Sequence, residues 1–294
     1  MHNLSGFTVA MLGGDARELT LAVALAECGV TVKTLGVPVD GENITVCGMP
    51  EECLTGANAL ILPVPGVKEN MRLHSAYLKD PPEITGELLA LLPENAPVLV
   101  GIARESLRQL VKQAGLRLVE LMRMDEVAIL NSIPSAEGAV QIAMEKLPVT
   151  IHGSRCLVLG FGRTAQTLAQ LLHAMHAVTT VVARNPNQLA RAEAMGLHTL
   201  HLSELATCLQ QPDVIFNTIP APVITGSVLK QLTPATLIID LASAPGGTDF
   251  AAAEKLGIEA LLAPGLPGKV APKTAGLLLA RVVSRVLWQT RHTR

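Results

Sequence analysis

A glycine-rich run at positions 159–165, LGFGRTA, carries the clearest chemical signal in the sequence. Gly160, Gly162 and Ala165 have the G-x-G-x-x-A spacing of a dinucleotide-binding turn, between a strand-like and a helix-like segment. We expect Gly160 to make the tight turn and Gly162 to let a pyrophosphate approach the backbone. The first N–H groups of the helix would then attract the phosphates. The alternative is a plain glycine-rich turn, and the full context favours the dinucleotide site.

The residue that follows the next strand-like segment indicates which dinucleotide is bound. An NAD site usually carries an Asp or Glu there, about 20 residues after the glycines, which accepts a hydrogen bond from the ribose 2′-hydroxyl. This sequence has Arg184 followed by Asn185. A guanidinium can hold a 2′-phosphate through two parallel hydrogen bonds, whereas the alternative is a solvated arginine at a strand end. We therefore predict NADP rather than NAD.

Two loops further along the chain are expected to line the nicotinamide end of the site. NTIP at 217–220 follows one strand-like segment, and DLASAPGG at 240–247 follows the next. Ligands of open α/β sheets lie beyond the carboxyl ends of the strands, although Asn217 and Asp240 could alternatively serve only as loop caps. The residues expected to contact the cofactor are Gly160, Gly162, Arg163, Thr164, Arg184, Asn185, Asn217, Thr218, Ile219 and Pro220.

Strand-like and helix-like segments alternate along almost the whole chain, which indicates parallel α/β units. The strands expected in the first half are 8–12, 30–35, 59–62, 98–100 and 116–119, with helices at 16–28 and 105–114. The strands expected in the second half are 155–159, 179–183, 214–217, 237–241 and 259–262, with helices at 164–174, 188–195, 226–232 and 250–256. Residues 63–82, rich in Pro and Gly, are expected to form an irregular loop.

A length of 294 residues favours two domains over one. We expect an α/β fold of two Rossmann-like, doubly wound parallel-sheet domains, joined by a connecting helix at 134–147, with a cleft between them. The first domain would span residues 1–133, and the apolar C-terminal helix, 272–294, would pack back onto it. The NADP-binding domain would span 134–271 and include the connecting helix, with Pro134 in its first turn.

Composition excludes several classes of function. The net charge of −2, with only one Trp, one Tyr and four Phe, offers neither a basic stripe nor a stacking surface for nucleic acid. No apolar run approaches the ~18 residues of a membrane helix, and the N-terminus lacks the basic start of a signal peptide. Five scattered cysteines without CxxC spacing predict no disulfide framework and no metal site, which suits a reducing cytoplasm.

Several motifs together resemble the A subunit of dipicolinate synthase, and they occur in order through the whole chain. The motifs are GGDAR (13–17), NSIPSAEGA (131–139), LGFGRTA (159–165), NTIP (217–220), DLASAPGGTDF (240–250) and APGLPGKVAPKTAG (263–276). The last is the most specific. More distantly, the two-domain layout is similar to that of alanine dehydrogenases and 2-hydroxy-acid dehydrogenases.

The resemblance implies an NADP-dependent dehydrogenase subunit that oxidises dihydrodipicolinate to pyridine-2,6-dicarboxylate. It implies a second, flavoprotein-like chain, the B subunit of dipicolinate synthase, and a location in the cytoplasm of the mother cell of a sporulating bacterium. The apolar last helix and the low surface charge also favour homo-oligomerisation or partner binding. The alternatives are another NADP-dependent dehydrogenase, of alanine or shikimate type, and a non-catalytic protein that senses NADP.

A dicarboxylate substrate needs cationic or N–H donors at each end. Lys273 falls on the motif lysine of the family at the start of the last helix, and we expect it to bind a carboxylate and to act in catalysis. Arg17 is the second choice, and we expect Asp15 and Ser243 to contact the substrate as well.

The general base is open at this point. Glu137, in the connecting helix, and Asp240, at the end of a strand, are the candidates. Water is the third candidate, because aromatisation of the ring already drives the reaction.

Overall fold

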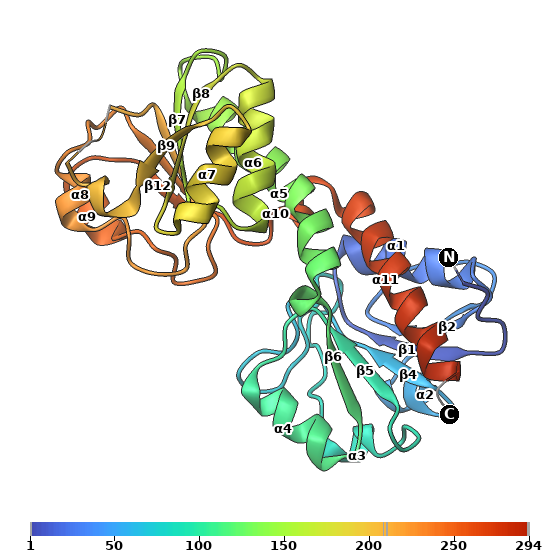
Figure 1. Cartoon of the computed structure of the whole chain (residues 1–294). Helices are drawn as coiled ribbons and strands as arrows, with labels where there is room; N and C mark the ends of the chain where they lie inside the picture. Colours follow the sequence, from blue (N-terminus) through green and yellow to red (C-terminus); the bar gives the residue numbers. More distant parts are fainter. Residues whose placement is uncertain (1, 208, 210, 293–294) are drawn as a thin grey trace. The chain divides into compact units, whose positions relative to one another are not determined.

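The computed structural model describes residues 2–207, 209 and 211–292. The chain forms two compact units, one made of residues 1–130 with 271–294 and the other of residues 131–270. Each unit contains a six-stranded parallel sheet with helices between the strands (Figure 1). The expected α/β class with two Rossmann-like parallel sheets is confirmed. Residues 293–294 of the expected last helix, and Cys208, lie outside the described residues, and the other four cysteines are free thiols.

The sheet of the first unit has the strand order β3-β2-β1-β4-β5-β6, the doubly wound order of a Rossmann fold. Its strands are β1 (Thr8–Leu12), β2 (Thr31–Leu35), β3 (Ile44–Val46), β4 (Ala59–Ile61), β5 (Pro97–Val100) and β6 (Arg117–Glu120). Its helices are α1 (Ala16–Ala26), α2 (Pro50–Leu54), α3 (Gly86–Leu89), α4 (Glu105–Gln113), the 3₁₀ turn η1 (Leu121–Arg123) and α11 (Pro272–His292). Between β4 and α3 the chain is irregular, as expected for a Pro- and Gly-rich segment.

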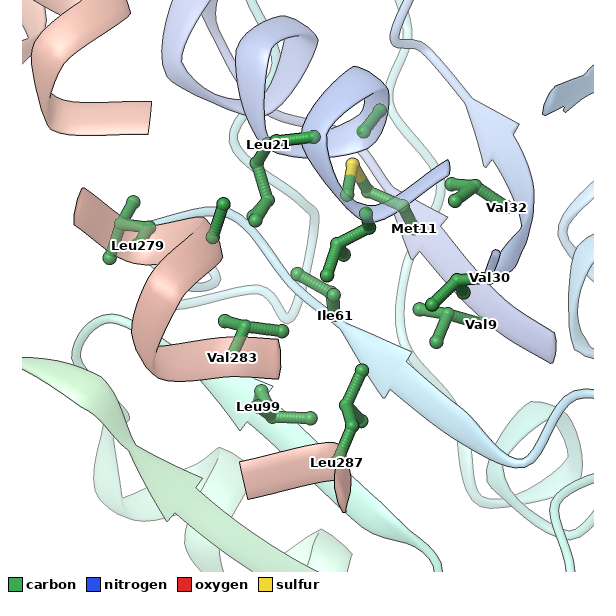
Figure 2. Close-up of a cluster of buried hydrophobic side chains, with 14 of the residues drawn as sticks. Val9, Met11, Leu21, Val30, Val32, Ile61, Leu99, Leu279, Val283 and Leu287 are labelled. Carbon is green, nitrogen blue, oxygen red and sulfur yellow. The ribbon is translucent and has the colours of Figure 1, made fainter. Parts of the chain in front are cut away.

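Helix α11 belongs to the first unit because its apolar face completes that unit's core. Figure 2 shows Leu279, Val283 and Leu287 of α11 beside the strand residues Ile61 and Leu99, all of them buried. Burying each such side chain contributes roughly 1.5–3 kcal/mol relative to leaving it in water. The sequence-distant helix is thereby held against β4 and β5.

Helices α1 and α11 also pack directly against each other. A Cβ placed on Gly276 would lie only 2.5 Å from the carbonyl oxygen of Arg17 and 2.6 Å from Cβ of Thr20. Glycine is therefore required where the two helices touch. The contact fixes the first turn of α11, which carries Lys273, near the start of α1.

The sheet of the second unit has the order β12-β11-β10-β7-β8-β9, again a doubly wound pattern. Its strands are β7 (Arg155–Leu159), β8 (Val178–Ala183), β9 (His198–His201), β10 (Val214–Asn217), β11 (Leu237–Asp240) and β12 (Ala260–Leu262). Its helices are α6 (Arg163–Ala174), α7 (Pro186–Ala194), η2 (Leu202–Glu204), α8 (Gly226–Leu229), α9 (Phe250–Lys255) and α10 (Leu266–Val270). The central strands β7, β10 and β11 are buried on both faces, which explains their continuous apolar runs.

The connecting helix differs from its prediction. Helix α5 spans Asp125–Lys146, so it starts nine residues early and holds Pro134 in its interior. The start signal is the acidic pair Asp125 and Glu126, which suits the positive end of a helix, and Val127 is anchored in the core of the first unit. One missing backbone hydrogen bond at Pro134 does not outweigh that packing.

Seven other elements of the described residues were not expected from the sequence, namely β3, β9, α2, α3, α10 and the 3₁₀ turns η1 and η2. Strand β3 is a three-residue edge strand, and β9 has an exposed histidine at each end with two half-buried residues between them, so neither gives an apolar run. Helix α10 forms across Leu266–Val270, because a proline is tolerated in a first helical turn. Gly138 of α5 accommodates it, since a Cβ there would lie 3.2 Å from Cβ of Leu266.

Candidate functional site

The turn between β7 and α6 requires glycine at its first position. Gly160 has φ +93°, and a Cβ on it would lie 2.5 Å from Oγ1 of Thr218. Its N–H donates to the carbonyl of Val182 over 2.8 Å, and both the N–H and the hydroxyl of Thr218 donate to the carbonyl of Leu159, over 3.0 and 2.8 Å. The turn is thus pinned between β8 and the loop after β10.

Gly162 differs from Gly160 in that the backbone does not require glycine there. It is the N-cap of α6, with φ −80° and ψ −167°, and a Cβ on it would meet no heavy atom of the described residues within 4 Å. Since glycine has no side chain with which to cap a helix, α6 begins without a side-chain cap. Phe161 is buried below the turn and Ala165 packs into the core. This arrangement fits a pyrophosphate at the start of α6.

The end of β8 carries the residues expected to determine whether NADP or NAD binds. Arg184 is exposed there. Asn185 is the N-cap of α7, and its Oδ1 accepts a hydrogen bond from the backbone N–H of Asn187 over 2.9 Å. The exposed guanidinium suits a 2′-phosphate, whereas the Asn185 side chain is already used in capping.

Two residues near Arg184 were missed by sequence reasoning. Nε2 of His201 lies 3.3 Å from the carbonyl oxygen of Arg184, and Nδ1 of His201 lies 2.6 Å from Oγ of Ser203. His201 is paired in register with Ala183, the last residue of β8. His201 could have been identified from its position at the carboxyl end of β9, the strand next to β8.

Asn217 and Asp240, the last residues of β10 and β11, are paired in register and hydrogen-bonded to each other. The Asp240 carboxylate is fully buried and also accepts hydrogen bonds from the N–H groups of Ala242 and Gly247, over 3.0 and 2.8 Å, and from the Thr248 hydroxyl over 2.7 Å. All four donors are groups of the protein itself, so the hydrogen bonds of this carboxylate are made within the fold. The carboxylate thus organises the loop that follows β11.

The remaining members of these two loops lie nearer the surface. Ile219 and Thr218 are half-buried and Pro220 is exposed, and the N–H of Ile219 donates to Oδ1 of Asn217 over 3.0 Å. Ser243 is exposed in the loop after β11, just before a cis Ala244–Pro245 bond. The structure therefore brings the expected cofactor residues of β7, β10 and β11 to one edge of the sheet.

The glycine turn of the first unit is closed, in contrast to that of the second. A Cβ on Gly13 would lie 2.7 Å from the carbonyl oxygen of His74, and the N–H of Gly14 donates to that same oxygen over 3.0 Å. Asp15 and Glu18 form a capping box that satisfies the start of α1. The position that a phosphate would need is thus filled by residues of the chain itself.

Arg17, expected to bind substrate, is engaged inside the first unit. Its Nε and Nη2 donate to Oδ1 and Oδ2 of Asp15 over 2.9 and 2.7 Å, and its side chain is 8% exposed. Burial raises the pKa of Asp15, but the hydrogen bonds and charge of Arg17 outweigh it and lower that pKa. The two residues thus form a closed ion pair.

Glu18 is a buried carboxylate that sequence reasoning did not single out. Its Oε2 accepts from the N–H of Asp15 over 2.8 Å, and its Oε1 accepts from the N–H of Val64 over 3.0 Å. Burial raises its pKa to about 6. Glu18 joins the start of α1 to the segment after β4.

The other two candidate catalytic residues lie in different units. Lys273 is exposed on the first turn of α11 in the first unit. Glu137 is exposed on α5 in the second unit, where it lines a shallow hollow with Leu171 and Met175, close to the C-terminal end of α6. The glycine turn lies at the opposite end of that helix, so the structure does not bring Glu137 to the turn.

Membrane insertion and metal binding find no support in the described part of the chain. None of its helices is both long and apolar enough to cross a membrane. In the same residues, no group of three or more His, Cys, Asp or Glu side chains is placed to hold a metal ion.

Family models match both halves of the chain. Residues 8–122 match the N-terminal domain of the dipicolinate synthase A subunit, and residues 141–249 match shikimate / quinate 5-dehydrogenase. The second match covers the open glycine turn and the loops after β10 and β11. The second unit thus has a dehydrogenase-type, nucleotide-binding fold.

Individual proteins match over almost the full length. The chain is 40% identical over 287 residues to the dipicolinate synthase A subunit of Bacillus subtilis (strain 168), which covers 97% of each sequence. The crystal structure of the dipicolinate synthase A subunit from Bacillus halodurans has a TM-score of 0.93 and 40% identity, covering 97% of this chain and 98% of that one. An L-alanine dehydrogenase has a TM-score of 0.63 at 14% identity, with 95% and 89% covered, and shares the fold. The chain belongs to the family of dipicolinate synthase A subunits.

Proposed function

We propose that this chain is the dehydrogenase subunit of a dipicolinate synthase and that it oxidises dihydrodipicolinate to pyridine-2,6-dicarboxylate with NADP. The observation that carries the proposal is the open turn at Gly162, which begins α6 without a side-chain cap, while the matching turn of the first unit is closed. Of the two glycine turns, the one in the second unit is therefore the one that offers a helix start to a pyrophosphate.

The choice of NADP rests on Arg184. Its side chain is exposed at the carboxyl end of β8, where the ribose of a dinucleotide lies in this fold. Arg184 precedes α7, whose start is already capped by Asn185. The guanidinium is thus left for a ligand, and a 2′-phosphate is the ligand whose geometry it matches.

The proposed reaction removes a hydride from an sp3 ring carbon and a proton from the ring, so that an aromatic pyridine results. When bound, the nicotinamide accepts the hydride. The protein's tasks are to orient the ring and to neutralise two carboxylates, and Lys273 on the first turn of α11 supplies one exposed cation. Water takes the proton in this proposal, because the Asp240 carboxylate is engaged by four protein donors and Glu137 lies at the far end of α6.

We further propose that the chain works with a second, flavoprotein-like subunit in the cytoplasm of the mother cell of a sporulating bacterium. The support is the family itself, whose members are named as one subunit of a synthase. The exposed apolar residues Met144, near the end of α5, and Val149, which follows that helix, offer contact area for a partner or for a second copy.

The test mixes purified full-length chain with NADP and freshly generated dihydrodipicolinate, with and without the second subunit. Nicotinamide reduction and the ultraviolet band of the aromatic product are followed together. We expect both signals to grow in equal molar amounts. Cofactor binding without either signal in both mixtures would instead favour a sensor or another substrate, such as that of an alanine- or shikimate-type dehydrogenase.

A further inference from the structure

The irregular segment after β4 forms a short hairpin with one buried and one outward face. Val67 and Leu73 pair in an antiparallel bridge and are both fully buried. The N–H of Lys68 donates to the carbonyl of Arg72 over 2.8 Å. Since neighbouring side chains of an extended chain point to opposite faces, Lys68, Arg72 and His74 share the face away from the core.

A third cation, Arg104, joins Lys68 and Arg72 on this face from another loop. Arg104 follows β5 and is the N-cap of α4. Its Nε donates to the carbonyl oxygen of Val67 over 3.2 Å, which holds the guanidinium beside the hairpin. His74 is in turn tied to the turn after β1, because its carbonyl accepts the N–H of Gly14. The cations thus gather at the carboxyl edge of the sheet, where ligands of this fold lie.

The positive charge at this edge is only partly neutralised. Arg72 pairs with Asp80, and Nη1 of Arg104 lies 3.6 Å from Oε1 of Glu69, whose side chain is 90% exposed. Glu83 lies opposite Arg72 in an antiparallel backbone bridge. Within residues 2–207, 209 and 211–292, the side chains of Lys68 and His74 make no hydrogen bond or ion pair.

The titration of His74 reflects the same crowding. Burial lowers the pKa of its imidazole, and the charges of Lys68 and Arg104 lower it further. The histidine is therefore a neutral donor beside two permanent cations. A ligand that brings negative charge would relieve this repulsion.

The residues at this edge can supply the substrate-binding cation that Arg17 does not supply. The sequence favoured Arg17 as the cation of the first unit, but its guanidinium is bound at two points by Asp15 and is 8% exposed. Lys68 and Arg104 come from loops at the same edge of the same sheet, and both are exposed. Their exposure lets them meet a ligand, whereas Arg17 is buried.

We propose that Lys68, His74 and Arg104 form an anion subsite that binds one carboxylate of a small dicarboxylate. The inference rests on the proposed function, because it names the part of the first unit that holds that reaction's substrate. Lys68 and Arg104 supply charge-assisted hydrogen bonds, and the imidazole of His74 supplies a third donor. The second carboxylate is left to Lys273 or to backbone N–H groups.

The test is isothermal titration of the full-length chain with pyridine-2,6-dicarboxylate, the product itself. Lys68→Gln and Arg104→Gln should each raise its Kd about tenfold, because each removes a charge-assisted hydrogen bond. Lys79→Gln is the matched control, since Lys79 is an exposed cation of the same segment outside the cluster, and it should change Kd less than about twofold. Arg104→Lys keeps the charge and should recover part of the affinity.

A second readout follows His74 directly. Histidine NMR signals are titrated with and without product, and His74 is assigned by the signal lost in His74→Gln. Bound carboxylate should raise the pKa of His74, and the rise should disappear in the Lys68→Gln, Arg104→Gln double variant. An unchanged pKa in the presence of saturating product would overturn the inference.

Different results would contradict the anion subsite and the proposed function. If the wild-type chain turns over dihydrodipicolinate while Lys68→Gln and Arg104→Gln keep its KM and product Kd, the subsite is wrong and the proposed function stands. If the wild-type chain binds NADP but shows neither turnover nor product binding, both are wrong. The thermal unfolding midpoint, and the NADP affinity measured by isothermal titration, should be the same in all variants, which shows that they are folded.

Discussion

The side chains of Asn217 and Asp240 join the ends of two neighbouring strands, with Nδ2 of Asn217 3.0 Å from Oδ1 of Asp240. The same amide donates to the carbonyl of Ile219 over 3.1 Å, so both loops of this sheet edge depend on one contact. A buried carboxylate with four donors is strongly committed to its neighbours. The pair therefore positions the loops after β10 and β11.

Asp240→Asn tests whether this aspartate is structural. An amide in its place turns one acceptor into a donor, which opposes the N–H of Gly247 or the hydroxyl of Thr248. We expect the free energy of unfolding to fall by about 2–3 kcal/mol in urea denaturation. Glu254→Gln, at an exposed position of α9, is the control and should change it by less than about 0.5 kcal/mol. Unchanged stability with lost turnover would restore Asp240 as the general base.

The two glycines of the LGFG turn should respond differently to alanine. Gly160→Ala forces a side chain into φ +93° and against Oγ1 of Thr218, so thermal unfolding should show a loss of about 1–3 kcal/mol. Gly162→Ala meets no described atom and should cost less than about 1 kcal/mol, yet its methyl group occupies the space proposed for pyrophosphate. We expect it to raise the Kd for NADP at least tenfold. Equal NADP affinity in Gly162→Ala and wild type would argue against a cofactor at this turn.

Local spacing predicts the open turn well, because strand, glycines and helix follow one another within a few residues. The engagement of Arg17 and Asp240 could not be predicted in the same way. Three of the four donors to Asp240 are separated from it by five residues or more, and the partner of Arg17 is an acid that could equally have faced substrate. Sequence reveals a charged residue at a strand end, but not whether its charge is already paired.

The hairpin cations were missed for a related reason. Lys68 and His74 lie in a segment with no regular periodicity, so only the bridge between Val67 and Leu73 shows that they share a face. Arg104 joins them through a contact across 37 positions of sequence. Long-range backbone pairing in irregular segments leaves no pattern that a period of 2 or 3.6 would detect.

Arg184 should separate NADP from NAD. Arg184→Gln removes the guanidinium proposed for the 2′-phosphate, so we expect the Kd for NADP to rise roughly tenfold to a hundredfold and that for NAD to change less than about twofold. Isothermal titration with both cofactors measures this. Arg191→Gln, an exposed arginine of α7, is the matched control. Parallel losses for both cofactors would show that Arg184 does not choose between them.

Glu18 should give the first unit a measurable pH dependence. Its pKa rises from 4.5 to about 6 on folding, so its contribution to stability is fully present below about pH 4.5 and is lost as the pH rises through 6. The difference corresponds to about 2 kcal/mol, and the lowered pKa of Asp15 acts in the opposite direction at lower pH. Urea denaturation of wild type and Glu18→Gln between pH 4.5 and 7.5 isolates this contribution. The free energy of unfolding of wild type, relative to that of Glu18→Gln, should increase as the pH falls. A difference that stays constant with pH would show that the pKa of Glu18 is not raised on folding.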